Sequence, residues 1–346
     1  MTPLTTPQDA QDGATRPRGS RIGARLSRRK KLFRRRRFMA RTVANLDRSP
    51  AVVALDGPFQ HDHVYTRGIR LHVAVAGLPE DPLILLIHGS FGGWFDYRDV
   101  IAPLAKAGFH VAAVDMRGYG MSDKPPNGYD LRHAAGDING IIAALGHDRA
   151  LLVGNDTGGS VAWTTATVYP ERVEGVLSVG ALHPVDFRRA VRRQPLLFLP
   201  DLGRLGLFRL PIPVLKLLRS VVIRASRREV AQNTGPAYQR SGSFAETARL
   251  RRKAMSIDHA FTPMIRNNRL LTGTLPAKLQ KDTTPAPVWL LKQHTHRWDH
   301  LIPYARARST GTLRVISIPG TKNLPHLENP EEFAAQVAQF GNQLRR

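Results

Sequence analysis

The segment Gly-Asn-Asp-Thr-Gly at residues 154–158 constrains the fold more than any other part of this chain. It follows the short apolar run 150–153 and precedes a predicted helix that continues through residues 163–168. Two glycines around one larger residue let a strand and a helix pack closely, and the sharp turn raises the central side chain above the sheet edge. The central Asp156 carboxylate can displace a leaving group at carbon and form an ester, so Asp156 is the candidate nucleophile. The alternative is an aspartate that merely caps the helix.

The rest of the sequence repeats the order of strand and then helix. LILLI at 83–87 and HVAAV at 110–114 are typical of buried strands, and two shorter strands are predicted around a turn at Arg67-Gly68. We expect further strands at 176–179, 288–291 and 313–318, and helices at 134–145 and 331–344. This alternation predicts an α/β fold with a doubly wound, mostly parallel sheet that has helices on both faces.

Changes in composition divide the 346 residues into three parts. Residues 1–50 are rich in Pro, Thr, Gly and Arg and are predicted to form a disordered basic tail. Residues 51–182 and 285–346 carry the strand and helix pattern and form the expected core. Residues 183–284 interrupt this pattern with a helical, arginine-rich stretch, which we interpret as a cap inserted between two strands of the sheet.

The formal net charge of +24 is concentrated in two places. Residues 1–50 contain 14 Lys and Arg against 3 acids, and residues 183–283 contain 20 against 6. A basic tail and a basic insert suggest contact with an acidic surface, although a purely solubilising surface is the alternative. The run from Arg25 to Arg41 suits anionic lipid headgroups. Nucleic acid is the less favoured partner because no nucleic-acid-binding module follows.

Residues 195–224 combine many leucines with five Arg and Lys and one acid. Such a stretch can lie in a membrane interface, or its leucines can form the core of the cap and line a lipophilic substrate tunnel. Both interpretations favour an apolar small-molecule substrate. No run reaches about eighteen apolar residues, and no apolar region follows the N-terminal arginines, so we expect neither a transmembrane helix nor a signal peptide. The expected location is therefore cytoplasmic, with peripheral contact to a membrane in the first interpretation.

The chain lacks cysteine, which excludes disulfides and thiolate metal sites, and nothing in the sequence implies a metal or an organic cofactor. A second glycine-rich loop, HGSFGG at 88–93, follows the strand at 83–87. Such loops supply one backbone N–H to an oxyanion hole, and the residue after the nucleophile supplies the other. These donors are predicted to be the amides of Phe91 and Thr157. A dinucleotide-binding loop is disfavoured because G-x-G-x-x-G is absent.

With these motifs the chain resembles the α/β-hydrolase superfamily, specifically its epoxide hydrolase and haloalkane dehalogenase branch. The matching stretches are LILLIHGSFGGW, VAAVDMRGYGMSDKPPNGYD, LLVGNDTGGSVAW and PHLENPEEF. The resemblance implies that Asp156 opens an epoxide or expels a halide, and that a histidine, oriented by an acid, then activates water to hydrolyse the ester. It also implies a structural role for the loop that begins at Asp115.

The sequence departs from this family at the expected base and acid. Gapless alignment places Asn323 at the usual histidine position, and an amide cannot accept a proton in the useful pH range. A shift of three residues makes His326 the alternative base. Asp299 is the best match for the acid, at the cost of a small insertion. Histidines near Asp299 are further candidates to replace the base: His294, His296 and His300.

The residues expected to assist ring opening are also scarce. Epoxide hydrolases use tyrosines of the cap as proton donors, and residues 183–283 contain only Tyr238. Thr157 stands where dehalogenases usually have a halide-binding tryptophan. We therefore interpret the chain as an epoxide hydrolase-like enzyme that acts on a lipophilic substrate through an Asp156 ester. The alternative is a non-catalytic, lipid- or partner-binding relative, while an esterase is less favoured because the nucleophile is a carboxylate.

Overall fold

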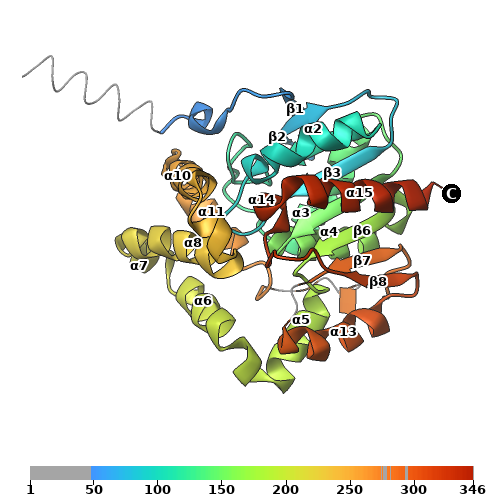
Figure 1. The fold of residues 1–346 in the computed structure, drawn as a ribbon. Helices are drawn as coiled ribbons and strands as arrows, with labels where there is room; N and C mark the ends of the chain where they lie inside the picture. The colour runs from blue at the N-terminus through green and yellow to red at the C-terminus, as the bar shows by residue number, and fades with distance from the viewer. Residues whose placement is uncertain (1–47, 274, 276–278, 281, 293–294, 346) are drawn as a thin grey trace, which may run out of the picture. The chain divides into compact units, whose positions relative to one another are not determined.

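The computed structural model describes residues 48–345 except 274, 276–278, 281 and 293–294. In these residues eight strands form one sheet in the order β1-β2-β4-β3-β5-β6-β7-β8 (Figure 1). β1 and β2 pair antiparallel, as do β2 and β4, and the other pairs are parallel. The strands are β1 (Gln60–Thr66), β2 (Ile69–Ala76), β3 (Leu83–Ile87), β4 (His110–Val114), β5 (Ala150–Asn155), β6 (Val173–Val179), β7 (Val288–Leu291) and β8 (Leu313–Ile316). The predicted α/β class with a mostly parallel sheet is confirmed.

The apolar sequence of the central strands explains why the sheet is covered on both faces. All residues of β3 and β5 are buried. Successive side chains of a strand point to opposite faces. Accordingly, Leu85 and Ile87 belong to one hydrophobic cluster, and Ile84 and Leu86 belong to another. The first cluster includes side chains of α3 (Leu131–Ala144) and α4 (Thr157–Val168), and the second includes those of α2 (Arg98–Lys106) and α15 (Pro330–Leu344).

Helices fill the chain between β6 and β7, and we call this region the insert. Its helices are α5 (Pro184–Arg193), α6 (Leu199–Arg209), α7 (Ile212–Leu217), α8 (Arg219–Asn233), α9 (Pro236–Gln239), α10 (Gly242–Ser256) and α11 (Phe261–Asn267). After β7 come α13 (His296–Arg308) and, beyond β8, the short α14 (Pro325–Glu328). Prolines at the first turns of α5, α6, α7 and α9 suit positions whose N–H has no partner within the helix. Residues 1–47 of the predicted tail, which include Arg25–Arg41, lie outside the described residues.

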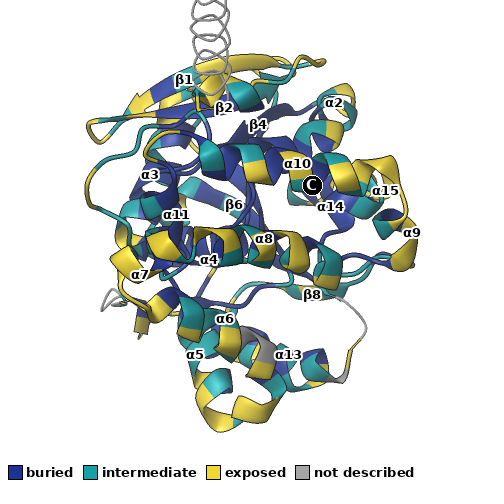
Figure 2. Ribbon diagram, turned by 90° about the vertical axis from the view of Figure 1, so that its left-hand side faces the viewer, coloured by how far each residue is buried: buried dark blue, intermediate teal, exposed yellow. Residues whose placement is uncertain are grey.

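Part of the insert carries an unusual amount of exposed apolar surface. Seven large hydrophobic residues are exposed in the described chain, and five of them lie between residues 196 and 217. Leu196 is 78% exposed and Leu217 is 85% exposed. Figure 2 shows exposed positions along α6 and α7. Within the described residues, no helix is both long and apolar enough to span a membrane.

The loop after β4 is organised by one buried carboxylate, as the resemblance implies. Asp115 accepts hydrogen bonds from the backbone N–H groups of Trp94 and Met121, each at 3.0 Å, and contacts Nδ1 of His72 at 3.0 Å. Burial by itself raises the pKa of Asp115, but His72 and the hydrogen bonds outweigh it and lower that pKa to about 2. Asp115 therefore ties this loop to the loop after β3.

Candidate functional site

A strained turn presents Asp156 at the end of β5. Asp156 has φ 48° and ψ −118°, and α4 begins at the next residue. A side chain other than glycine rarely adopts a positive φ, and such strain is concentrated at functional sites. A Cβ atom at Gly158 would lie 2.2 Å from the carbonyl oxygen of Ile87, and one at Gly154 would lie 2.5 Å from the backbone of Gly158. The two glycines are therefore required for β3, β5 and α4 to pack this closely.

The two carboxylate oxygens of Asp156 have different surroundings. Oδ2 accepts hydrogen bonds from the backbone N–H of Ser90 at 3.2 Å and from its hydroxyl at 2.6 Å. The Thr157 hydroxyl lies 3.4 Å from the same oxygen and also contacts the Ser90 hydroxyl. Oδ1 accepts instead from Nη2 of Arg204, at 3.3 Å. One oxygen is thus held by the loop after β3, and the other faces the insert.

The backbone N–H that the loop after β3 donates to Asp156 comes from the residue before the predicted one. The N–H that reaches Asp156 belongs to Ser90, whereas the prediction named Phe91. The Phe91 side chain is buried, and its ring centroid lies 5.7 Å from that of Phe208 in α6. The prediction for Phe91 is therefore corrected to Ser90, because the tight turn directs the amide of the earlier residue towards β5.

Arg204 sets the electrostatics of the Asp156 carboxylate. Burial raises the pKa of Asp156, but the Arg204 charge and the Ser90 hydrogen bonds outweigh burial, so the pKa lies below its usual value. The Arg204 side chain is 24% exposed and that of Asp156 28% exposed, so solvent screens this ion pair in part. Asp156 is therefore ionised at neutral pH.

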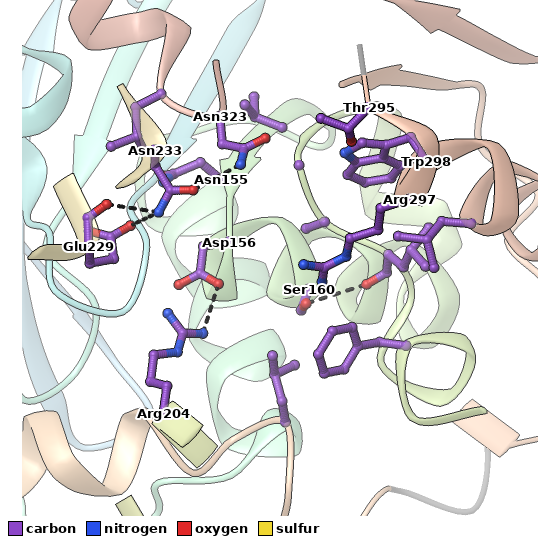
Figure 3. Close-up of a pocket in the computed structure, with 18 residues that line it drawn as sticks. Asn155, Asp156, Ser160, Arg204, Glu229, Asn233, Thr295, Arg297, Trp298 and Asn323 are labelled. Carbon is purple, nitrogen blue, oxygen red and sulfur yellow. Dashed lines mark hydrogen bonds and ion pairs between the residues drawn. The ribbon is translucent and has the colours of Figure 1, made fainter. Parts of the chain in front are cut away.

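Asp156 opens onto a cavity of about 310 Å³ between the sheet edge and the insert (Figure 3). Parallel strands bring their carboxyl ends to the same edge, where ligands of such sheets bind. One part of the lining is apolar: Val179, Leu182, Phe187, Leu271, Trp298, Leu301 and Leu324. The polar part consists of Asn155, Asp156, Ser160, Arg204, Glu229, Asn233, Thr295, Arg297 and Asn323.

Asn323, at the usual histidine position, does line this cavity. Its Nδ2 donates to Oδ1 of Asn233 in α8 at 2.8 Å, and its backbone N–H donates to the Asn233 carbonyl at 3.1 Å. The Asn323 Oδ1 is buried without a hydrogen-bond partner among the described residues. The structure therefore places an amide, bound to the insert, at the position where the family base is expected.

The alternative base, His326, is packed in the core. It is 1% exposed, and its ring stacks on Tyr97 with centroids 4.7 Å apart and packs against Phe333. Burial lowers the pKa of His326 to about 4, and within the described chain neither ring nitrogen has a hydrogen-bond partner. His326 does not line the cavity, so the structure does not bring it to Asp156. The ring of His326, in the short helix α14, packs against Phe333 of α15 instead.

Two other predicted residues also lie away from the cavity. Asp299 is exposed in the first turn of α13, and Thr295, directly before that helix, lines the cavity in its place. The Tyr238 hydroxyl contacts Oγ1 of Thr247 at 2.9 Å, and Tyr238 is absent from the lining. Of the three predicted histidines, His294 lies outside the described residues, and His300 does not line the cavity.

A carboxylate of the insert that the motifs did not reveal, Glu229, also lines the cavity. Glu229 in α8 accepts a hydrogen bond from Nδ2 of Asn233 at 3.0 Å through Oε1, and one from Nη1 of Arg251 at 2.5 Å through Oε2. Arg251, 2% exposed, also donates to Oδ2 of Asp96 at 2.8 Å. One sequence signal was available, because Glu229 is the only acid in residues 202–245.

The sheet order and the aspartate on a strained turn after β5 together define a protein with the α/β-hydrolase fold. A family model described as the alpha/beta hydrolase fold matches residues 82–217. The chain is 42% identical over 123 residues to the AB hydrolase superfamily protein YfhM of Bacillus subtilis (strain 168), which covers 35% of this chain. It is 34% identical over 165 residues to epoxide hydrolase 4 of Mus musculus, which covers 46% of this chain. These matches span 43% and 46% of the two relatives, so the chain covers less than half of their length.

A solved structure supports the same assignment over most of the chain. Epoxide hydrolase A from Mycobacterium thermoresistibile superposes with a TM-score of 0.64 at 24% identity, over 82% of this chain and 98% of that chain. At this identity the likeness establishes the fold. The predicted resemblance to the epoxide hydrolase-like branch of the α/β-hydrolases is confirmed. Among the described residues, no group of three or more His, Cys, Asp or Glu side chains could hold a metal ion.

Proposed function

We propose that this chain is an epoxide hydrolase-like enzyme whose Asp156 forms an ester with a small electrophilic substrate. The observation that carries the proposal is the unequal environment of the two Asp156 oxygens. Oδ2 receives the Ser90 hydrogen bonds, and Oδ1 faces the cavity beside Arg204. An enzyme ester needs this division, because one oxygen attacks while the other takes up negative charge when water later attacks the ester.

The first step uses Oδ1 as the nucleophile. Oδ1 forms a bond to one epoxide carbon, the carbon–oxygen bond of the ring breaks, and the released oxygen takes a proton from water. Arg204 must move away from Oδ1 to admit the substrate, at a modest cost for a partly exposed ion pair. In the second step water attacks Cγ of Asp156, and Oδ2 becomes an oxyanion beside the Ser90 N–H and the first amide of α4, that of Thr157.

The cavity supports a small substrate with an apolar part. Its volume of about 310 Å³ suits a molecule of modest size. Leu182, Phe187, Leu271 and Leu301 line one part, whereas Asp156 lies in the polar part. We therefore propose a lipophilic epoxide as the substrate, with its ring towards Asp156.

A second candidate function is a binding protein that no longer turns substrate over. Two observations favour it: Asn323 and Thr295, in the segments that follow β8 and β7, line the cavity, and neither side chain can act as a base. In that case an Asp156 ester either never forms or persists once formed.

Intact-protein mass spectrometry separates these functions. The full chain is incubated with styrene oxide, 1,2-epoxyhexane and 1-bromohexane, and diol or bromide release is followed in parallel. Asp156→Asn serves as the blank, and Asp148→Asn, at an exposed surface position, is the matched control. We expect an adduct together with release of diol or bromide from wild type and D148N, and neither from D156N, whereas an adduct that persists without product would favour the binding protein. No adduct and no product with any of the three probes would reject the proposed enzyme and leave the binding protein.

We further propose that the exposed apolar part of the insert contacts an anionic membrane surface. Residues 187–228 contain eleven Arg and Lys and one acid. Exposed leucines stand among these cations, notably Leu196, Leu199 and Leu217. Apolar side chains that enter the headgroup region beside cations that bind acidic lipids are the features of an interfacial segment. The run Arg25–Arg41 adds charge of the same sign.

Vesicle flotation of the full chain tests the membrane proposal. We expect binding to vesicles of phosphatidylcholine with 30% phosphatidylserine (about 1 kcal/mol for each engaged cation), and weaker binding in high salt. Replacing Leu196, Leu199 and Leu217 by serine should reduce binding at least about tenfold, because each loses apolar contact with the bilayer. Leu78→Ser, which changes an exposed leucine outside the insert, is the control. Equal binding of the triple variant and wild type would contradict a role for the insert.

A further inference from the structure

The hydrolytic half of the proposed reaction needs a base, and the cavity lining narrows the candidates. Asparagine, serine and threonine side chains do not accept a proton near neutral pH, and arginine stays protonated. Among the described lining residues, this leaves the two carboxylates, Asp156 and Glu229. Asp156 is the nucleophile of the proposed reaction and cannot also activate the water that attacks it.

We propose that Glu229 is the catalytic base that activates water for hydrolysis of the Asp156 ester, in place of the missing histidine. This inference rests on the proposed function. Glu229 reaches the cavity from α8, on the side of the insert, whereas Asp156 reaches it from the sheet. The Glu229 side chain is 13% exposed, which leaves it accessible from the cavity while it is shielded from bulk solvent.

Neighbouring side chains fix the orientation of the Glu229 carboxylate. Oε1 accepts from Nδ2 of Asn233, and Oε2 accepts from Arg251, which is itself anchored on Asp96. A carboxylate has about four acceptor positions, so these two hydrogen bonds leave positions for a water molecule. A base held by its neighbours loses little freedom when it binds water, which favours proton transfer.

Asn323 has a role in this arrangement as a positioning residue. Its Nδ2 donates to Oδ1 of Asn233, and this bond turns the Nδ2 of Asn233 towards Glu229. The chain Asn323–Asn233–Glu229 thus links the end of β8 to α8 (Figure 3). Asn323, at the position where the family has its histidine base, therefore orients Glu229, a base that the insert supplies.

The electrostatics suit a base that works near neutral pH. Burial raises the pKa of Glu229, Arg251 lowers it, and the Asp156 charge raises it, with the net result above the usual value. Formation of the ester removes the Asp156 charge and so lowers the Glu229 pKa from this value. Loss of the Asp156 charge therefore favours the ionised form of Glu229 at the step that needs a base.

Hydrolysis of the Asp156 ester moves one proton from water to Glu229 and then to the leaving oxygen. The water oxygen bonds to Cγ of the Asp156 ester, one water proton moves to Glu229, and the negative charge develops on Oδ2 beside Ser90. The bond from Cγ to the alkyl oxygen then breaks, and Glu229 returns the proton to that leaving oxygen. The Asp156 carboxyl group finally ionises and releases its proton to solvent, which balances the proton that the released oxygen took from water in the first step. The diol leaves, and both carboxylates regain their starting forms.

Single-turnover mass spectrometry with styrene oxide tests this role. We expect Glu229→Gln to form the Asp156 ester at a rate close to that of wild type and to hydrolyse it at least about 100-fold more slowly. Glu246→Gln is the matched control, because Glu246 is a carboxylate of the same insert that pairs with Arg249 on the surface. In wild type, ester hydrolysis should slow as the pH falls and Glu229 becomes protonated, and this dependence should be absent from E229Q.

The outcomes separate the inference from the proposed function. Neither ester nor diol with wild type rejects the proposed function itself. An ester on wild type that E229Q hydrolyses within threefold of the wild-type rate overturns the role of Glu229. An ester on wild type and none on E229Q makes Glu229 a structural residue and also overturns it. An E229Q ester that persists, while the E246Q ester is hydrolysed, supports Glu229 as the base.

Discussion

Replacing Arg251 by methionine probes the buried ion pairs that join α10 to the rest of the molecule. Arg251 is 2% exposed and pairs with Asp96, which is fully buried, and with Glu229. The substitution keeps most of the side-chain volume but leaves two carboxylates buried without their cation. Removing one partner of a buried ion pair costs about 3–5 kcal/mol, because the remaining charge is neither solvated nor paired. We expect a loss of unfolding free energy of this size at pH 7.

The pH dependence of this loss has a definite sign. Arg251 lowers the pKa of Glu229, so without Arg251 the pKa of Glu229 in the folded protein rises further above its unfolded value. Such a group destabilises the fold at neutral pH and ceases to do so as the pH falls below its folded-state pKa. The difference between R251M and wild type should therefore shrink between pH 7 and pH 5.

Urea unfolding followed by circular dichroism at both pH values measures the effect. The matched control is Arg249→Met, on the same helix, whose ion pair with Glu246 is exposed and is worth at most about 1 kcal/mol. The triple variant D96N/E229Q/R251M removes the buried charges together and should recover most of the loss. The reasoning is refuted if R251M lies within about 1 kcal/mol of wild type at pH 7, or if the loss is the same at pH 5.

Three further results are expected. Arg204→Leu removes the ion pair at Oδ1 of Asp156 and raises the pKa of that carboxylate. Ester formation, measured by the rise of the adduct mass, should therefore accelerate by up to about fivefold. A slower rate would show that Arg204 assists the substrate. The pKa of Asp115 is lowered to about 2 from 3.8, which stabilises the fold by about 2 kcal/mol above pH 3.8, and this contribution is lost as the pH falls through 2. In urea unfolding, Asp115→Asn should therefore lose this amount of unfolding free energy at pH 5 and progressively less towards pH 2. A loss that does not change with pH would contradict the assignment. In the E229Q background, Thr295→Asp with Asn323→His places an acid and an imidazole in the lining and should speed ester hydrolysis at least tenfold; no change would mean that these positions do not reach the ester.

The sequence predicts the sheet well because each strand has its own local signal, such as an apolar run or a flanking turn. The run 83–87 is apolar throughout and forms β3 with the predicted bounds, and residues 288–291 form β7 in the same way. The predicted turn at Arg67-Gly68 has positive φ at both residues, between β1 and β2. Helix ends are less accurate: the helix predicted at 134–145 begins at Leu131, because Asp130 caps it.

The site is predictable only where a local turn defines it. Asp156 is identifiable because its glycine neighbours are part of the same turn. The prediction of Asp299 assumes an insertion after β7, whereas the structure has Thr295, nearer to the end of β7, in the cavity lining. Glu229 and Arg204 reach the cavity through the packing of the insert, which depends on contacts distant in sequence. The prediction of Tyr238 rests on its chemistry alone, and in the structure its hydroxyl contacts Oγ1 of Thr247 instead.

The central claim is that the substrate is attacked by Asp156 and not by water. A single turnover of styrene oxide in H₂¹⁸O, with enzyme in excess, tests this claim directly. If the ester forms, water attacks Cγ, so ¹⁸O should enter the peptide that contains Asp156 while the diol carries only unlabelled oxygen. If ¹⁸O appears in the diol and the Asp156 peptide stays unlabelled, water attacks the substrate directly and the account is wrong.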